Sequence, residues 1–366
     1  MQKARRVLRI ITILAILLSI GWHQGLTCST FILKSEAELV FGGNLDFYTS
    51  RGLVIVNKRG VAKSAFLAPP ETPVSWASKY GSITFNQVGR EFPFGGLNEK
   101  GLVIQMMWLE ATDYPPVDDR PAIQALQWIQ YQLDNFATVS EVLESESKLR
   151  ISAPQATAKL HYLIGDAGGK AATIEFIGGK PVYHTGESLP VVALANSAYG
   201  DCLRFHDSLS LEERTGCVSY SSGDRFVRIA KAIDDFNSGN NISGVKHAFD
   251  ILESVKAPRR GSHCTAWSVV YDVKNMRLFF KTFENPEVRI IEFDNFDFSC
   301  ASPVMVLDMN TDLTGSSDEF IEYTPAVNEE LVSKVMTAYK ESGFLSEVTD
   351  EAIQLLAHYP DYLKCR

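Results

Sequence analysis

The sequence lacks the residue spacings that usually hold a metal ion. It contains no Cys-x-x-Cys pair, and its 7 histidines are scattered along 366 residues. His263 and Cys264 are adjacent, but they stand alone in a strand-like run, where packing in a core explains them better than a metal ion does. We therefore expect no metal ion and no other cofactor.

The chain also lacks an excess of positive charge. Its 44 acidic residues outnumber its 35 basic residues, which gives a net charge of −9 at pH 7. Proteins that bind nucleic acid usually carry the opposite sign, so we expect no nucleic-acid partner. There is no internal repeat, and 45% hydrophobic with 22% charged residues is typical of a soluble globular protein with a sizeable core.

Long apolar runs are missing except for one near the start of the chain. This run, Ile10 to Ile20, is shorter than the roughly 20 residues that cross a bilayer. The residues before it are basic: Lys3, Arg5, Arg6 and Arg9. Small residues, Gly25 and Thr27, precede Cys28, an order that is typical of a secretory signal peptide. We predict a signal peptide over residues 1–27, with export to the periplasm or the medium.

Two other interpretations of this leader stay open. The apolar run could remain uncut as a membrane anchor. Cys28 could instead carry a lipid, although lipidation usually follows Leu at −3 and Gly, Ala or Ser at −1, where this chain has Gly25 and Thr27.

Cysteine is scarce, and its pairing is undefined by the sequence. The cysteines are Cys28, Cys202, Cys217, Cys264, Cys300 and Cys365. An exported protein can oxidise such residues. If Cys28 stays free, an odd number remains, so at most two disulfides form. Cys202 and Cys217 are close in sequence and could pair, but sequence alone does not decide connectivity.

Runs of strands and runs of helices follow one another along the chain. Strand-like segments punctuated by glycine and proline extend from Cys28 to Trp108. A helix is expected from Pro121, and another after Thr138, where Glu141 completes a capping-box pattern. Further strands are expected near 160–164, 172–176, 191–195, 265–273, 277–282 and 288–293, and helices near 224–233, 245–254, 328–339 and 345–358. This order favours an α+β fold over a doubly wound one.

Cleavage before Cys28 would give one residue both a thiol and a free α-amine. That pair is the working unit of an N-terminal-nucleophile amide hydrolase, in which the amine acts as base for its own side chain. An α-amine has a pKa of about 7.7–8.0 and is therefore partly neutral at pH 7. Attack on an amide would give a thioester, which water then hydrolyses.

Three other residues could support this chemistry. Asp46, just after a turn, could orient the amine. Asn196 ends a strand-like run and could donate its amide to an oxyanion. Arg225 lies near a helix start, where a cation opposes the helix dipole, which suggests a carboxylate partner or a function. The simpler interpretations are a turn-capping Asp, a strand-ending turn and a solvated surface Arg.

Seven segments, taken in order, resemble the choloylglycine hydrolase family, the linear amide C-N hydrolases that include penicillin V acylases and conjugated bile salt hydrolases. The matching segments are Cys28–Phe31, Phe41–Asp46, Gly95–Leu102, His161–Asp166, Ala195–Ser197, Asp224–Arg228 and Thr265–Trp267. The resemblance extends from Cys28 to about Phe293.

This resemblance implies a four-layer αββα N-terminal-nucleophile fold with two stacked antiparallel sheets. It makes Cys28 the nucleophile, Asp46 the carboxylate that orients the amine, Asn196 an oxyanion and amine ligand, and Arg225 the family's late arginine. We expect the hydrolase domain over 28–307 and a C-terminal helical extension over 308–366. Family members often form tetramers, so the resemblance also suggests a homo-oligomer.

The resemblance further suggests the class of substrate. Trp108 falls where bile salt hydrolases have Asn and some penicillin acylases have Tyr, so its backbone N–H would help the oxyanion and its indole would line the pocket. With Phe47 and Trp76 as neighbours, it favours a small amide with an aromatic or fatty acyl group. Candidates are penicillin V-like amides, conjugated bile salts and N-acyl homoserine lactones.

One position departs from the family pattern. Members often carry arginine three residues before the aspartate, where this chain has Gly43. Either Arg51 or Arg225 replaces that charge, or the thiol is less activated. The alternative function is therefore a catalytically weak or inactive binding protein on the same fold.

Overall fold

The computed structural model describes residues 27–366 except 157, 239–242, 260, 262, 313, 346 and 347. The predicted signal peptide lies outside the described residues up to position 26. Among the residues that are described, no helix is long and apolar enough to cross a membrane.

One layer of the fold is a six-stranded antiparallel sheet. Its spatial order is β14 (Ala193–Leu194), β1 (Ser29–Lys34), β2 (Leu39–Phe47), β15 (Cys264–Asp272), β16 (Arg277–Thr282) and β17 (Arg289–Glu292). Strands β2 and β15 are buried along their whole length. Such burial on alternating sides indicates that both faces of the sheet are covered.

A nine-stranded antiparallel sheet forms the second layer. Its order is β13 (Lys180–Thr185), β12 (Ala171–Ile177), β11 (Leu160–Gly165), β8 (Val103–Trp108), β7 (Pro93–Asn98), β6 (Ser82–Asn86), β3 (Leu53–Asn57), β18 (Met305–Asp308) and β19 (Ile321–Glu322). Gly178 and Gly179 connect β12 to β13 with positive φ angles of 58° and 72°, which a tight hairpin turn requires.

Two small sheets complete the strands. One has the order β20 (Lys364–Cys365), β4 (Val61–Ser64) and β5 (Ser75–Ala77), and the other pairs β10 (Arg150–Ile151) with β9 (Ala122–Ile123) in parallel.

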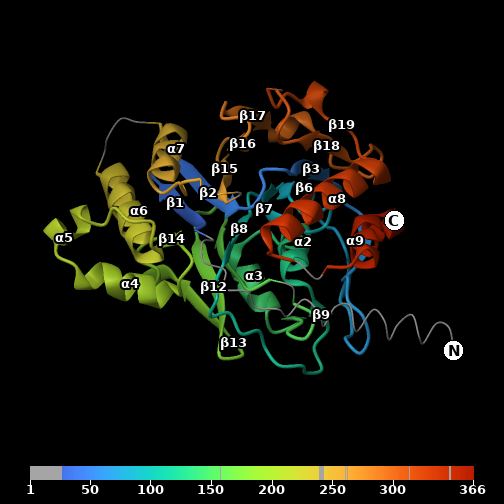
Figure 1. Ribbon diagram of the computed structural model, residues 1–366, viewed down its shortest axis with the longest axis horizontal. Helices are drawn as coiled ribbons and strands as arrows, with labels where there is room; N and C mark the ends of the chain where they lie inside the picture. The colour runs from blue at the N-terminus through green and yellow to red at the C-terminus, as the bar shows by residue number, and fades with distance from the viewer. Residues whose placement is uncertain are drawn as a thin grey trace.

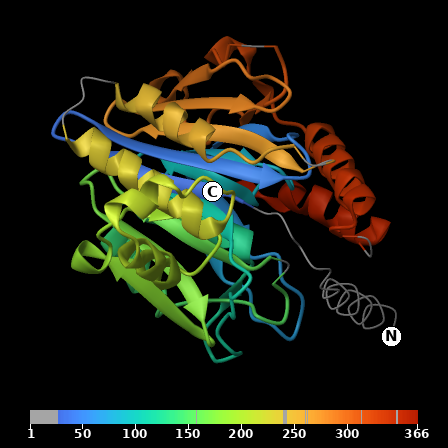
Figure 2. The ribbon, with the colours of Figure 1, turned by 60° about the vertical axis from the view of Figure 1, so that its left-hand side comes forward.

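Helices cover the outer faces of the two large sheets (Figures 1 and 2). Helices α6 and α7 pack against β1 and β2, whereas α2 packs against β7 and β8. This αββα layering confirms the predicted α+β fold. The α-helices are α2 (Ala125–Asn135), α3 (Val139–Ser145), α4 (Tyr199–Ser208), α5 (Leu211–Thr215), α6 (Ser222–Asn237), α7 (Gly244–Ser254), α8 (Pro325–Ser342) and α9 (Asp350–His358). The short 3-10 helices are η2 (Gly186–Ser188), η3 (Phe293–Asn295), η4 (Ser317–Glu319) and η5 (Tyr359–Tyr362).

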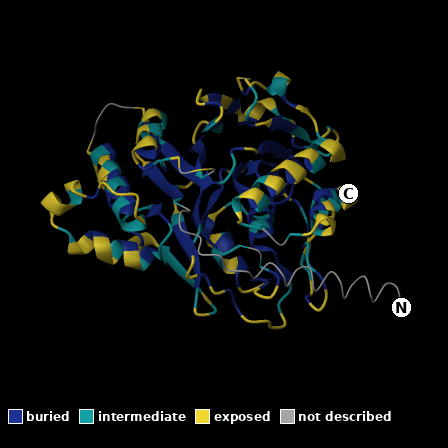
Figure 3. Ribbon diagram, in the orientation of Figure 1, coloured by how far each residue is buried: buried dark blue, intermediate teal, exposed yellow. Residues whose placement is uncertain are grey.

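Aromatic side chains fill the space between the two sheets. The ring of Phe85 on β6 lies 6.0 Å from that of Tyr271 on β15 and 5.7 Å from that of Phe280 on β16, between centroids. Tyr271 also donates a hydrogen bond of 3.4 Å to Gln105 on β8. The central strands of both large sheets are accordingly buried, whereas the helices expose one side (Figure 3). The core therefore lies between the sheets and fixes one against the other.

One helix begins later than the sequence predicts. Pro121 does not start a helix, because Ala122 and Ile123 pair with β10 and Ala122 also exchanges backbone hydrogen bonds with the 72–74 segment. Helix α2 begins only at Ala125. The predicted capping box is present at α3, where Thr138 accepts from the Glu141 N–H. Local capping chemistry was thus predictable, whereas a competing strand pairing was not.

The structure resolves the cysteine pairing that the sequence left open. Cys300 and Cys365 form a disulfide, whereas Cys202 and Cys217 are both free thiols. Cys202 lies on α4 within 3.7 Å of the Ser222 hydroxyl, and Cys217 follows α5, so different helices hold the two apart. The observed disulfide ties the end of the chain to the loop before β18.

Candidate active site

Strand pairing brings Cys28 next to Asp46. Cys28 immediately precedes β1, and the β1–β2 register, which sets Ser29 opposite Asn44, places the end of β2 beside it. The Asp46 N–H points to the Cys28 Sγ atom at 3.4 Å, and Cys28 is only 2% exposed. The thiol is therefore buried and fixed by the backbone.

Two threonine hydroxyls hold the carboxylate of Asp46. The Thr265 and Thr27 hydroxyls each donate to one oxygen at 2.5 Å. Burial raises the pKa of Asp46, and the two hydrogen bonds oppose that rise. Thr265 was overlooked as a site residue in the sequence, although it lies in one of the segments that carry the family resemblance.

The environment of Cys28 raises the pKa of its thiol. Burial, and then the negative charge of Asp46, raise its pKa to about 12, while the positive charge of Arg225 acts in the opposite direction. At neutral pH the thiol therefore keeps its proton unless a base lies beside it.

Arg225 connects the surroundings of Cys28 to the neighbouring strands. It lies in the first turns of α6 but is only 1% exposed. Its guanidinium donates to the Cys28 carbonyl, to the Ser29 hydroxyl at 2.6 Å and to the Asn196 side-chain oxygen at 2.8 Å. Because these three oxygen atoms accept hydrogen bonds from the guanidinium, they explain why a cation lies near the start of a helix. Of the two arginines considered as replacements for the family's missing charge, Arg225 acts on the thiol, whereas Arg51 is exposed.

Asn196 extends this network to the second sheet. Its backbone follows β14, and its side-chain amide donates to the carbonyl of Trp108 at the end of β8, at 2.9 Å. An amide NH₂ group has two N–H donors, so this bond uses only one of them. Cys28, Arg225, Asn196 and Trp108 thus form one connected chain of contacts across the two sheets.

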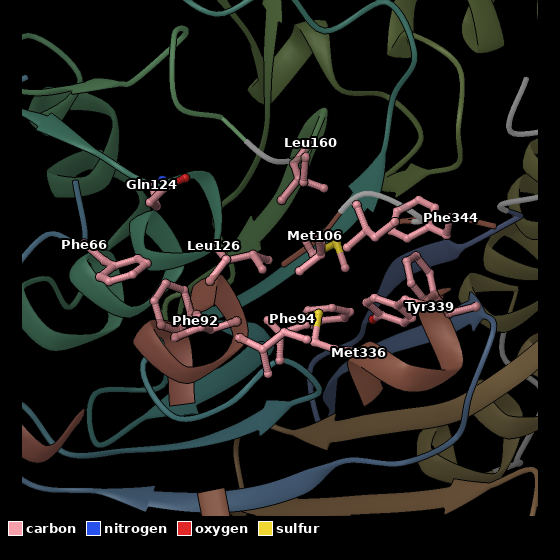
Figure 4. Close-up of a pocket in the computed structure, with 18 of the residues that line it drawn as sticks. Phe66, Phe92, Phe94, Met106, Gln124, Leu126, Leu160, Met336, Tyr339 and Phe344 are labelled. Carbon is pink, nitrogen blue, oxygen red and sulfur yellow. The ribbon is translucent and has the colours of Figure 1, made fainter. Parts of the chain in front are cut away.

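Cys28 lies on the wall of a large apolar cavity of about 360 Å³. Trp108 and Phe47, both predicted to bind substrate, also line it. Further lining residues, all of which precede the C-terminal helices, are Leu45, Phe66, Phe92, Phe94, Met106 and Leu160. Figure 4 shows several of these side chains pointing into the cavity, with Gln124 among few polar groups. A volume in this range is typical of a small-molecule site.

The third predicted substrate-binding residue lies elsewhere. Trp76 is on β5, and it does not line the cavity. Its indole N–H donates to Asp134 on α2 at 2.7 Å, and its ring lies 5.4 Å from that of Tyr131. The prediction for Trp76 is therefore corrected: pairing of β5 with β4 turns this side chain under α2, where it packs in the core.

A large part of the cavity wall comes from residues that the sequence did not identify as lining a site. Met336 and Tyr339 on α8, Phe344 in the following loop, and Leu356 on α9 all line the cavity. The apolar spacing of the two C-terminal helices could have indicated a buried face. It could not indicate which surface that face would cover.

Gly43 is packed against a residue of the opposite sheet. A Cβ atom at this position would lie 3.1 Å from Cγ and 3.2 Å from Cδ of Gln105 on β8. The long polar side chain of Gln105 therefore occupies the space that a side chain at Gly43 would need.

Among the described residues, no group of three or more His, Cys, Asp or Glu side chains is arranged to hold a metal ion.

Comparisons with known proteins identify the family of this chain. The family described as linear amide C-N hydrolases, choloylglycine hydrolase family, matches residues 28–194 and 216–306. A penicillin V acylase of Pectobacterium atrosepticum is 28% identical over 268 residues, which are 62% of this chain and 69% of that protein.

Solved structures resemble the fold over most of the chain. Penicillin V acylase from Agrobacterium tumefaciens has a TM-score of 0.69 and 26% identity, covering 81% of this chain and 98% of that one. Two mutant forms of the conjugated bile acid hydrolase from Clostridium perfringens have TM-scores of 0.64 at 16% identity, covering 79% of this chain and 98% of each. The bile acid hydrolase structures thus share the fold of this chain.

Proposed function

This chain belongs to the choloylglycine hydrolase family of linear amide C-N hydrolases, and from that premise we propose that it hydrolyses the amide bond of a small N-acyl compound with Cys28 as the nucleophile. The observation that carries the proposal is the contact network of Cys28 with Asp46, Arg225 and Asn196 on the wall of an apolar cavity. Family membership supplies the reaction class, and this network supplies the residues.

The first step of the proposal is removal of the leader before Cys28. The Thr27 hydroxyl donates a hydrogen bond to the Asp46 carboxylate, so the Thr27–Cys28 peptide bond lies close to this carboxylate. Cleavage there generates an α-amine within reach of a buried carboxylate, which holds and orients it. Export of the protein follows from the same leader, and the Cys300–Cys365 disulfide is consistent with an oxidising compartment.

The new amine supplies the base that the buried thiol needs. It takes the proton of the Cys28 thiol as the sulfur attacks the amide carbonyl carbon. The resulting oxyanion accepts a hydrogen bond from the second N–H of the Asn196 amide. Collapse of this intermediate breaks the C–N bond, and the amine passes its proton to the leaving nitrogen. Water then attacks the thioester, releases the carboxylic acid and restores the thiol.

The acyl group lies in the apolar cavity in this proposal. Trp108 and Phe47 line this cavity together with Cys28, and their aromatic rings offer apolar surface that can bury an acyl group. An acyl chain in the cavity leaves its carbonyl at the thiol, so recognition of the acyl group also positions the bond to be broken.

The test begins with N-terminal sequencing and intact mass of the exported protein, followed by hydrolysis of penicillin V, conjugated bile salts and N-acyl homoserine lactones. We expect a chain that starts at Cys28 and cleaves at least one class. Cys28→Ala removes activity, whereas Cys202→Ala, which changes another buried free thiol, keeps it. A correctly trimmed protein that is inactive toward all three classes contradicts the proposal.

A binding protein without turnover is the second candidate. It is favoured by Gly43, which leaves the site without the arginine that is frequent in the family, and by a thiol whose pKa burial raises to about 12. Tight binding of acyl compounds by the trimmed protein, with no hydrolysis, distinguishes it from the first candidate.

A further inference from the structure

Much of the cavity wall comes from residues that the family match does not include. The match ends at residue 306. Residues that line the cavity beyond it include Met336, Tyr339, Phe344, Val348, Ile353 and Leu356. They belong to α8, α9 and the connection between them, which together cover one side of the cavity. We refer to residues 325–366 as the C-terminal cover.

The C-terminal cover contacts both ends of the cavity. Near the nucleophile, the ring of Phe344 lies 6.0 Å from that of Trp108 and 5.0 Å from that of Phe47. At the other end, the ring of Tyr359, directly after α9, lies 5.3 Å from that of Phe66 and 5.6 Å from that of Phe92.

Figure 4 shows that these two ends are separated along the cavity. Phe344 and Tyr339 lie at one end, Phe66 and Phe92 lie at the other, and Met106 is between them. The cavity is therefore elongated, with Trp108 and its contacts to the catalytic network near the Phe344 end.

The C-terminal cover is fastened to the hydrolase domain at several points. Asn328 accepts from the Arg90 N–H at 2.8 Å, and its amide also donates to the Ala357 carbonyl at 2.6 Å, which joins α8 to α9. The end of the chain pairs with β4 through β20 and carries the Cys300–Cys365 disulfide. These contacts hold the C-terminal cover against the rest of the fold, so the side of the cavity that it forms is part of the folded structure.

The chemistry of the lining selects among acyl groups. The Trp108 indole N–H donates to Glu110, and the Tyr339 hydroxyl donates to Gln87. A steroid acyl group would bring several hydroxyls into this apolar space, where unpaired polar groups are costly. A short phenoxyacetyl group would leave the Phe66 end empty. An unbranched aliphatic chain fills an elongated apolar cavity and needs no polar partner.

We propose that the C-terminal cover, which lies beyond the family match, sets the length of the acyl chain that this enzyme accepts. This inference rests on the proposed function for the position of the carbonyl at Cys28, but acyl binding itself requires no catalysis. Each methylene that enters the cavity strengthens binding by about fourfold, until the chain reaches the Phe66 end.

The test measures binding of straight-chain fatty acids, from butyrate to palmitate, to the trimmed Cys28→Ala protein. Leu356 lines the cavity one helical turn before Tyr359, so Leu356→Trp shortens the space near the Phe66 end. Excluding two methylenes costs about fifteenfold. We expect that loss for the long chains only, with butyrate binding unchanged.

A matched control lies on the same helix. Gln354 is exposed and does not line the cavity, so Gln354→Trp leaves the length profile as it is. If Leu356→Trp fails to fold, Ala352→Leu adds smaller bulk to the same wall. A length profile that neither folded variant changes overturns the inference.

Hydrolysis of the matching fatty acyl amides by the active protein separates the two proposals. Length-dependent binding that Leu356→Trp shortens, without any hydrolysis, contradicts the proposed function and leaves the cover's role intact. Hydrolysis whose chain-length preference stays the same in Leu356→Trp contradicts the cover's role alone.

Discussion

The hydroxyl of Thr27 donates a hydrogen bond of 2.5 Å to the carboxylate of Asp46, the same group that receives the hydroxyl of Thr265. Thr27 is the last residue of the predicted leader. The carboxylate therefore already has a hydrogen-bond donor beside Cys28, and in the proposed reaction cleavage of the leader would replace that donor by an amine.

A protein that keeps Thr27 should be inactive. Its Cys28 nitrogen is a peptide nitrogen and cannot act as a base, and burial raises the pKa of the thiol to about 12. We expect no measurable hydrolysis from a chain made with a residue or tag before Cys28, and full activity from a chain that starts at Cys28. Equal activity of the two forms would show that the α-amine is not the base.

Asp46→Asn should lower kcat by roughly 100-fold or more, since the amine loses the charge that orients it. The lost negative charge also lowers the pKa of the amine, so the rise of activity with pH moves to lower pH. Asp272→Asn is a matched control, because Asp272 is a buried carboxylate on β15 that pairs with Arg277. An unshifted pH profile in Asp46→Asn argues that the residue serves folding only.

Gly43→Arg should destabilise the protein by about 1–3 kcal/mol, because the new side chain overpacks against Gln105. Adding Gln105→Ala removes the clashing atoms and should restore stability. The control is a second double variant, Gly43→Met with Gln105→Ala, which adds similar bulk without charge. If the family's arginine helps activate the thiol, the variant with Gly43→Arg and Gln105→Ala has a higher kcat/KM than this control. Equal rates in the two double variants would show that the missing charge is irrelevant here.

Stability should depend on pH through Glu146. Burial raises its pKa from 4.5 to about 7, and the Trp128 indole N–H, which donates at 2.7 Å, opposes that rise. Between these values the native state holds a proton that the unfolded chain has lost, so stability falls as pH rises from 4.5 to 7. Glu146→Gln should remove up to roughly 3 kcal/mol of this dependence, measured by urea unfolding across that range. A wild-type curve that is flat there contradicts the prediction.

Cys365→Ser should cost about 2–4 kcal/mol of unfolding free energy, because the disulfide closes a long loop in the unfolded chain. Reductant should lower the stability of the wild-type protein and leave that of the variant unchanged. The same treatment of a Cys217→Ser protein should act as on wild type, since Cys217 is a free thiol.

The sequence predicted those parts that depend on local patterns. The α+β class followed from the order of strands and helices, and the family resemblance from short motifs such as Phe41–Asp46. The structure brings Cys28, Asp46, Asn196 and Arg225 together, because adjacent strands and the start of α6 meet at one end of the six-stranded sheet.

What the sequence did not predict depends on packing between distant segments. The sequence does not distinguish Trp76 from an aromatic residue that lines a pocket. In the structure, β5 directs its side chain toward Asp134, to which the indole N–H donates a hydrogen bond. Cys365 pairs with Cys300 only because β20 returns to β4. Likewise, an apolar helix face near residues 350–358 indicates burial but not the surface that it buries.

The cavity joins segments that lie far apart in the polypeptide, since Cys28 forms one part of its wall and α9 another. A ribosome makes the proposed nucleophile long before it makes α9. Activity that needs the closed cavity can therefore begin only after α9 has been translated. A stop codon introduced before α9 would leave Cys28 intact and still remove one wall of the cavity.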